Sequence, residues 1–352
     1  MSHTRIEKAN GRLNRSLVKP DTAKRGMTVK IHRIGAGVCL AVLLILHLTG
    51  CSFRSAGPLP SAAPDNAYLT VVDDAGRTVI LAKKPERVVI LSASLVDLYY
   101  AVGGRAVGRL DSKTLALSPE AQALPLVGMV GNVNLEALIS LQPDLVIGLQ
   151  GAGEQLIPVM ESSRIPYLLL RMKTYEDVRQ KMKLFGDIAG TGPQAGEKAA
   201  DLDSRVQATI QQLPVASKKV VILHATAKTV TVELENTIAG DVAKMLRLNN
   251  IAAGSRALDG NPDMTPYSME KLIEADPDLV MITLMGNHES IERRLRADVE
   301  SNPAWTSLRA VKSKQIFFLP TGLYWLNPGI RYDEAVLQMA RIVYPEVFKH
   351  GK

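Results

Sequence analysis

Eight side chains with useful binding chemistry are expected to follow the carboxyl ends of predicted β-strands. In open α/β sheets, ligands bind in the crevice just outside these ends. The set holds two arginines, two methionines, two histidines and a Tyr-Trp pair, and it predicts a binding site rather than a catalytic one. The candidates are Arg109, Met129, Arg171, His224, Met285, His288, Tyr324 and Trp325.

These candidates have different uses. Arg109 and Arg171 carry guanidinium groups, whose planar fork suits planar anions, or they are simply solvated surface arginines. Trp325, with Tyr324, offers a flat surface to an aromatic ligand, or it packs against the closing helix. The methionines either ligate a metal centre or line an apolar wall, and the histidines are ligands or polar loop residues.

The segments that would position these residues alternate between strand and helix, which predicts an α/β fold with a parallel sheet. An initial hairpin, 68–72 with 77–81, turns at Gly76, and the stretch 124–132 is predicted to be a loop. The predicted strands are 88–91, 106–109, 165–170, 220–223 and 315–319, and the predicted helices are 95–102, 175–189, 238–246, 290–299 and 332–343.

One stretch occurs twice. Asn134–Gly148 (NLEALISLQPDLVIG) returns as Ser268–Ile282 (SMEKLIEADPDLVMI), 134 residues later. Each copy predicts a short helix with an N-cap and a first-turn glutamate, Glu136 or Glu270, then a buried strand after Pro-Asp. RVVIL at 87–91 returns as KVVIL at 219–223, so we predict two halves with one plan.

A long helix is expected between the halves. Gly190–Pro193 breaks the chain, and 194–213 is a strongly helical stretch of about twenty residues. We therefore predict an N-terminal lobe at 68–190, a bridging helix at 191–214 and a C-terminal lobe at 215–352. The fold class is α/β, with mostly parallel sheets joined by one long helix.

The basic charge of the chain lies in its first segment. The formal charge is +7, but residues 1–50 hold nine Lys and Arg against Glu7 and Asp21, and the remaining residues balance. No basic surface is left for nucleic acid as a partner.

Residues 1–50 are predicted to be a signal peptide with a basic extension. Lys30 and Arg33 precede the apolar run 34–48, which is shorter than a membrane span, although a retained signal anchor is the alternative. Leu-Thr-Gly-Cys51 resembles a bacterial lipobox, in which Cys51 is lipidated. Residues 51–67, rich in Ser, Ala and Pro, predict a flexible tether, and Met27 is an alternative start.

Other classes of function find little support in the sequence. Cys39 lies in the apolar run, so Cys51 alone would remain and no disulfide is expected. His224, His288 and His350 are too scattered to predict a metal site. Gly190–Ala195 matches G-x-G-x-x-A but follows a helix, and there is no phosphate-loop motif for ATP hydrolysis. We predict that the chain is not an enzyme.

Taken in order, several motifs resemble one family. They are the lipobox, DDAGRTV at 73–79, RVVILS at 87–92, the two glutamate repeats and NPAW…AVK at 302–312. The chain resembles the substrate-binding lipoproteins of iron-complex ABC importers over about 68–348. The resemblance implies two Rossmann-like lobes, a ligand between them, no separate cofactor, and a monomer tethered outside the cytoplasmic membrane. It also implies a permease with a separate ATPase as partners.

The resemblance also suggests roles for residues. Glu136 and Glu270 would dock on permease arginines, or they are ordinary first-turn acids. Haem-binding relatives carry Tyr where this chain has Met129, so a ferric siderophore, held by Arg109 and Arg171, is the expected ligand. Haem is the alternative, ligated by Met129 with Met285 or His288. Cobalamin comes third, resting on Trp325 and Tyr324.

Overall fold

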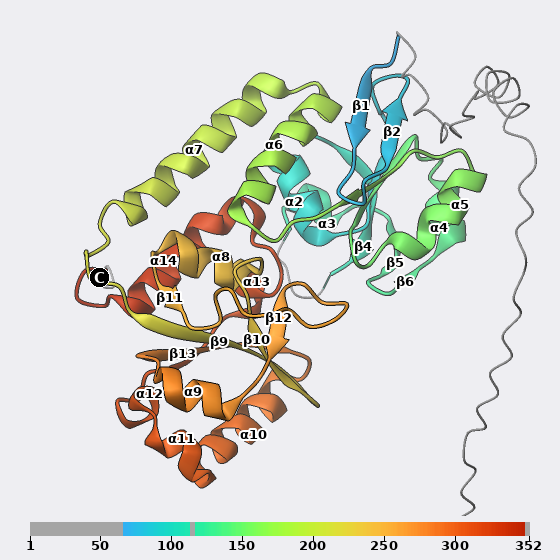
Figure 1. Cartoon of the computed structure of the whole chain (residues 1–352). Helices are drawn as coiled ribbons and strands as arrows, with labels where there is room; N and C mark the ends of the chain where they lie inside the picture. Colours follow the sequence, from blue (N-terminus) through green and yellow to red (C-terminus); the bar gives the residue numbers. More distant parts are fainter. Residues whose placement is uncertain (1–65, 113–116, 349–352) are drawn as a thin grey trace, which may run out of the picture. The chain divides into compact units, whose positions relative to one another are not determined.

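A computed structural model of the chain describes residues 66–112 and 117–348 (Figure 1). The predicted signal peptide, the lipidation site Cys51 and most of the tether lie outside these residues, as does His350. The described part begins with the predicted hairpin, in which β1 (Leu69–Val72) pairs antiparallel with β2 (Thr78–Leu81). At its turn, the Asp73 carboxylate accepts hydrogen bonds from the backbone N–H groups of Ala75 and Arg77.

The first large sheet has six strands in the order β6-β5-β4-β3-β7-β8. All neighbours are parallel except β5 and β6, which form a hairpin. The strands are β3 (Val88–Ile90), β4 (Ala106–Asp111), β5 (Leu126–Met129), β6 (Asn132–Val133), β7 (Leu145–Leu149) and β8 (Tyr167–Leu170). The loop predicted at 124–132 was therefore wrong. Pro125 and two glycines suggested a loop, but Val127 is fully buried and the segment extends the sheet beside β4.

The second sheet has a parallel centre and an antiparallel edge. Its order is β12-β10-β9-β13-β14, with β11 also paired to β9. Strands β10 and β12 run antiparallel to their neighbours, and the other pairs are parallel. The strands are β9 (Lys219–Thr226), β10 (Val230–Glu233), β11 (Asn249–Asn250), β12 (Met264–Pro266), β13 (Leu279–Met285) and β14 (Ile316–Phe318).

The helices cover both sheets. Those that matter most here are α2 (Ala93–Ala101), α4 (Leu135–Ser140), α6 (Tyr175–Ala189), α7 (Gly192–Ile210), α8 (Ile238–Met245), α9 (Met269–Ala275), α13 (Thr321–Tyr324) and α14 (Tyr332–Val343). The rest are α3 (Pro119–Gln122), α5 (Ile157–Ser162), α10 (His288–Ser301), α11 (Pro303–Ser307) and α12 (Arg309–Lys312), with the 3-10 turns η1 (Glu154–Leu156) and η2 (Gly329–Arg331). Within the described ranges, no helix combines the length and the apolar character that a membrane span requires.

The repeat in the sequence is a repeat in the structure. In each half, the helix of the repeat (α4 or α9) leads into a strand (β7 or β13) that pairs in parallel with β3 or β9, respectively. The registers correspond, because Val88 lies opposite Leu145 and Val220 lies opposite Leu279. The predicted caps are also present, since Asn134 and Ser268 each accept a hydrogen bond from the N–H three residues on.

The aspartate that follows proline in each repeat has a structural role. Asp144 accepts a hydrogen bond of 2.8 Å from the N–H of Arg87, and Asp278 accepts one of 2.8 Å from the N–H of Lys219. Each carboxylate therefore fixes the start of the neighbouring strand. The residues before the prolines, Gln142 and Asp276, both adopt positive φ, at 46° and 42°.

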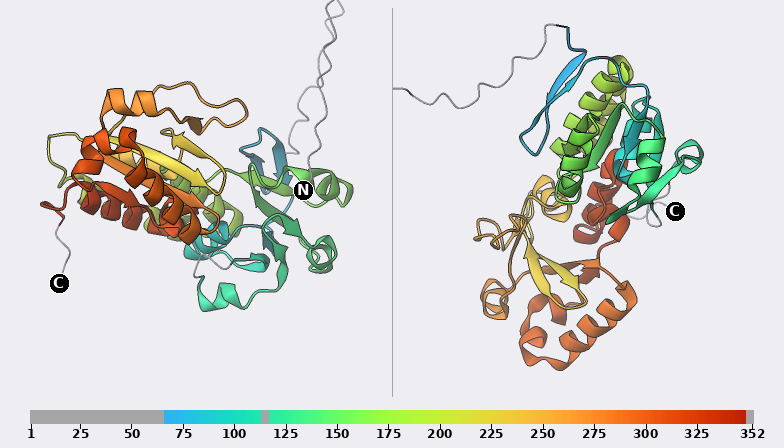
Figure 2. Two further views of the ribbon diagram at one scale, coloured as in Figure 1. Left: turned by 90° about the horizontal axis from the view of Figure 1, so that it is seen from below. Right: turned by 90° about the vertical axis from the view of Figure 1, so that its right-hand side faces the viewer.

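The largest core cluster is shared by the two sheets. Alternate residues of the central strands face it, such as Val88 and Ile90 on β3 and Val220 and Ile222 on β9. Helices α6, α7, α8 and α14 fill the space between, and α7 packs on α6 and α14 (Figures 1 and 2). The predicted α/β fold class is confirmed, and the long helix runs from Gly192 to Ile210 rather than from 194 to 213.

Candidate ligand site

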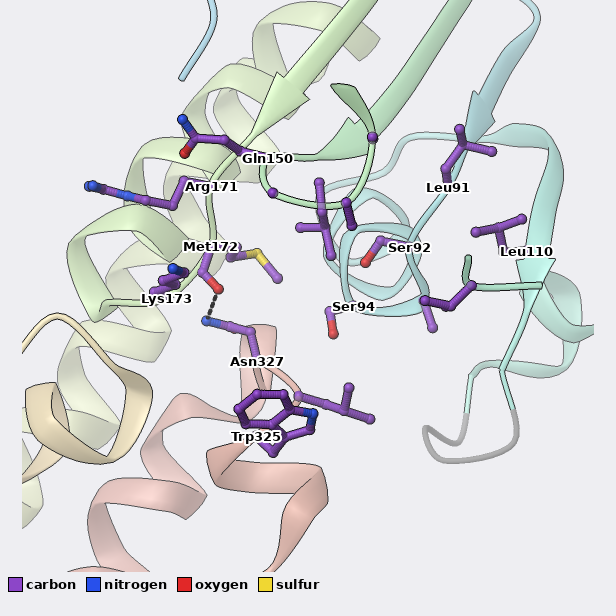
Figure 3. Close-up of a pocket in the computed structure, with 18 of the residues that line it drawn as sticks. Leu91, Ser92, Ser94, Leu110, Gln150, Arg171, Met172, Lys173, Trp325 and Asn327 are labelled. Carbon is purple, nitrogen blue, oxygen red and sulfur yellow. Dashed lines mark hydrogen bonds between the residues drawn. The ribbon is translucent and has the colours of Figure 1, made fainter. Parts of the chain in front are cut away.

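A cavity of about 770 Å³ lies between the two sheets and is lined from both (Figure 3). This volume is within the usual range for small-molecule sites. Its first wall comes from the ends of β3, β4, β5, β7 and β8, as expected for a parallel sheet. Its second wall comes from β10, the 261–264 segment and the 324–327 segment after α13.

The first wall mixes apolar side chains with hydroxyls. Strand β3 ends before Leu91, and the chain turns at Ser92 into α2, so Leu91, Ser92 and Ser94 all line the cavity. Ser92 is the N-cap residue of α2, but its side chain makes no cap hydrogen bond. Its hydroxyl is therefore not committed to the helix end. Figure 3 shows Leu91 and Leu110 on one side of the cavity and Arg171 on the other.

Two cations, Arg171 and Lys173, follow β8 and line the cavity. The Arg171 guanidinium bonds the buried Asp177 carboxylate through Nη2 at 2.9 Å and Nε at 3.3 Å. Burial tends to raise the pKa of Asp177, but hydrogen bonds from Arg171 and from two backbone N–H groups outweigh it and hold that pKa below its ordinary value. Lys173 pairs with Asp263 of the second half. Both cations are thus fixed in place yet partly exposed.

The two walls are also joined by neutral contacts. The Asn327 side chain donates a hydrogen bond of 3.0 Å to the carbonyl oxygen of Met172, as Figure 3 shows. Outside the cavity lining, the half-buried Asp241 accepts hydrogen bonds from the Tyr175 N–H and the Tyr332 hydroxyl, both at 2.8 Å. The cavity is therefore held at one end by contacts between the two halves.

Trp325 forms the aromatic part of the second wall. Its ring stacks on the His224 imidazole, with centroids 4.5 Å apart and planes at 20°. His224 is buried behind it, and its Nδ1 lies 3.0 Å from the Thr283 hydroxyl. Burial lowers the pKa of His224. The neutral imidazole thus supports Trp325 from behind.

Four of the eight candidate residues line the cavity, namely Met129, Arg171, Tyr324 and Trp325. Met129 ends β5 and is 56% exposed. Tyr324 contributes only an edge, because it is buried and its hydroxyl donates a hydrogen bond of 2.6 Å to the carbonyl oxygen of Ala335.

The structure places the other four away from the cavity lining. The Arg109 guanidinium is buried and donates to three backbone carbonyls, those of Ala121, Leu110 and Gln122. It therefore closes the 118–123 turn onto β4. Met285 and His288 are exposed, and His288 contacts the Thr321 hydroxyl at 3.0 Å. His224 reaches the site only through Trp325.

Sequence reasoning missed Lys173, Asn327 and Glu233, which all line the cavity. Glu233 lies on β10, a strand that the prediction omitted. The sequence TVTVE at 229–233 is rich in β-branched residues and could have indicated it. Lys173 stands three residues beyond a predicted strand, so the strand-end rule could have included it. In the described ranges, no cluster of three His, Cys, Asp or Glu residues is arranged to hold a metal ion.

The two glutamates of the repeat lie on the surface. Glu136 is in the first turn of α4 and Glu270 in the first turn of α9, and both are exposed. One turn further on, the equivalent isoleucines Ile139 and Ile273 are also exposed, at 44% and 43%. Each half therefore presents the same pair of side chains, one acidic and one apolar.

A family model described as periplasmic binding protein matches residues 88–322, which include both sheets and most of the residues that line the cavity. The chain belongs to this family. Family membership confirms the resemblance seen in the sequence.

Relatives of known name are similar over most of the chain. The uncharacterized ABC transporter substrate-binding lipoprotein YvrC of Bacillus subtilis is 26% identical, covering 89% of this chain and 98% of its own. The Fe(3+)-citrate-binding protein YfmC of Bacillus subtilis is 23% identical, covering 84% and 92%. The Fe(3+) dicitrate-binding periplasmic protein FecB of Escherichia coli is 26% identical, covering 77% and 89%.

Solved structures share the fold. An ABC transporter substrate-binding protein from Listeria monocytogenes superposes with a TM-score of 0.67 at 18% identity, covering 75% of this chain and all of that one. Staphylococcus aureus IsdE complexed with heme gives 0.64 at 19% identity, covering 73% and 98%. At these identities the likeness establishes the two-lobed α/β fold.

Proposed function

We propose that this periplasmic binding protein captures an anionic ferric chelate outside the cytoplasmic membrane and delivers it to an ABC permease. The importer's separate ATPase would supply the energy. The names of YvrC, YfmC and FecB support this assignment, since they describe ABC substrate binding and ferric citrate binding. A ferric siderophore of the carboxylate type is the ligand that the site suits best.

The observation that carries the proposal is the pair of cations on one wall of the cavity. Arg171 uses Nε and Nη2 on Asp177, which leaves its Nη1 without a hydrogen-bond partner among the described residues. Guanidinium and ammonium groups suit the carboxylate oxygens of an iron chelate. Trp325 adds a flat apolar surface on the opposite wall.

The anchor and the docking surface belong to the same proposal. Cys51 would carry the lipid that holds the chain at the membrane, because the leader sequence ends in a lipobox-like motif and YvrC is named a lipoprotein. Glu136 and Glu270 would contact the permease, one from each half, and the protein would act as a monomer.

Tryptophan fluorescence tests the ligand directly. The chain has two tryptophans, of which Trp325 lines the cavity and Trp305 is buried in the core of the second half. Ferric citrate should quench the purified protein saturably. Trp325→Phe should lose this quenching, and Trp305→Phe should keep it. Equal quenching in both variants, or none in the wild type, would contradict binding in this cavity.

Haem is the second candidate, favoured by Met129, whose thioether lines the cavity and can ligate haem iron. Met285 and His288, its expected partners, lie off the cavity. Under the chelate proposal, haemin should produce no saturable Soret shift. A stoichiometric shift that Met129→Ala abolishes would make haem the ligand.

A further inference from the structure

A buried carboxyl group in the second wall of the cavity is only partly hydrogen-bonded. Glu233 ends β10, lines the cavity and is 1% exposed. Its Oε1 accepts a hydrogen bond from the Thr283 hydroxyl, whereas its buried Oε2 has no hydrogen-bond partner among the described residues. Leaving such an oxygen unpaired costs stability, because its hydration is lost without a replacement hydrogen bond. A group kept at that cost beside a binding cavity calls for a function.

The surroundings of Glu233 supply no positive charge. Its neighbours on the same face of the sheet are Thr283 and His224, which lie opposite each other on β13 and β9. The His224 Nδ1 lies 3.0 Å from the Thr283 hydroxyl and 3.7 Å from Glu233 Oε1. Burial lowers the pKa of His224, which favours the uncharged imidazole, so the histidine does not form an ion pair with Glu233.

The other groups near Glu233 do not balance a negative charge on its carboxylate either. Asp263, in the segment before β12, repels a second negative charge, and Lys173 is already paired with Asp263. Thr237, before α8, offers only a hydroxyl. The Thr237 hydroxyl donates to the Leu234 carbonyl oxygen. Burial outweighs the hydrogen bond from Thr283 and raises the pKa of Glu233 to about 7. The carboxyl group is therefore neutral in mildly acidic solution, with a proton available on Oε2.

The charge of the cavity wall depends on this proton. Apart from Glu233, the lining carries two cations, Arg171 and Lys173, and two acids, Asp111 and Asp263. With Glu233 neutral the lining has no net charge, and with Glu233 ionised it is negative. An anion would be repelled by the ionised form and would find a hydrogen-bond donor in the neutral form.

We propose that protonated Glu233 is the anion-selecting residue of the site, where its Oε2–H donates a hydrogen bond to a carboxylate or carbonyl oxygen of the bound chelate. The inference rests on the proposed function and narrows the ligand to an oxygen-rich anion. Binding of such a ligand is then linked to retention of one proton, so affinity falls as pH rises.

The experiment compares the dissociation constant of ferric citrate for the wild type and Glu233→Gln between pH 6 and pH 8. Gln keeps an N–H donor but cannot ionise. At each pH, the dissociation constant of the wild type is divided by that of Glu233→Gln. This ratio should be about tenfold higher at pH 8 than at pH 6. Using this ratio cancels the ligand's own titration. Glu235→Gln, two residues on, should keep the wild-type profile, because this half-exposed carboxylate pairs with Lys244 and lies off the cavity lining.

A second variant tests the same group without replacing it. Thr283→Val removes the hydroxyl that stabilises the ionised carboxyl, so the weakening of binding should begin at higher pH. A ratio independent of pH would overturn the inference and leave the proposed function standing. A ratio that favours the wild type at high pH would identify a cationic ligand instead. Absence of ferric citrate binding at any pH would overturn both.

Discussion

The buried carboxyl of Glu233 should affect folding as well as binding. Its pKa is about 7 in the folded protein and 4.5 in its ordinary state, so the folded state holds the proton more tightly between these values. Stability is therefore lost as pH rises from about 4.5 through 7. Glu233→Gln should be close to wild type at pH 5 and more stable by about 3 kcal/mol at pH 8.

Urea denaturation at the two pH values measures this difference. Glu235→Gln is the matched control, since its carboxyl is on the surface and should give the same result at both. A stability difference between Glu233→Gln and the wild type that does not change with pH would mean that the carboxyl is ionised throughout.

At the residue scale, the sequence indicated which edge of the sheets forms the cavity, but only half of the candidate residues line it. The strand-end rule selected Arg171 and Trp325 correctly as cavity residues. It also selected Arg109, because a strand-end arginine looks the same whether it binds a ligand or its own backbone. The guanidinium of Arg109 donates hydrogen bonds to backbone carbonyl oxygens of α3. These contacts depend on tertiary structure and cannot be read from the sequence around Arg109.

At the scale of elements, the duplicated helices α4 and α9 lead to a docking prediction. Each exposes a glutamate and, one turn on, an isoleucine, so a partner with two equivalent surfaces could meet both. Glu136→Ala with Glu270→Ala should leave ligand affinity unchanged and reduce uptake through the permease by about tenfold. Loss of two exposed ion pairs accounts for an effect of this size.

Radiolabelled iron uptake in cells measures this effect. The control is Glu161→Ala with Glu274→Ala, which removes two exposed acids from α5 and from α9 itself. Normal uptake by the Glu136/Glu270 variant would show that the two carboxylates only support their helices.

Elements with clear apolar spacing, turns or caps could be predicted, whereas the edge strands β10 and β12 were missed. The repeats, the hairpin and the closing helix 332–343 follow from apolar spacing and caps, and α14 has these bounds. Strands β10 and β12 have four and three residues, too few to establish a period. β10 pairs with the edge of β9, and β12 pairs in turn with β10, so the formation of both depends on the sheet as well as on their own sequences.

At the scale of the whole described domain, the shared core predicts cooperative unfolding. One hydrophobic cluster contains residues of both sheets and of the helices between them. Calorimetry should therefore give a single transition whose van't Hoff and calorimetric enthalpies agree. Two resolved transitions would mean that the halves fold independently despite this cluster.

The shared core also bears on how the bound ligand is released. Helices α6, α7, α8 and α14 pack in a core shared by both sheets. We therefore expect the two halves to move little relative to each other. Release of the ligand should then require a partner that separates the two halves. The exposed repeat helices α4 and α9, one on each half, are the surfaces that such a partner would contact.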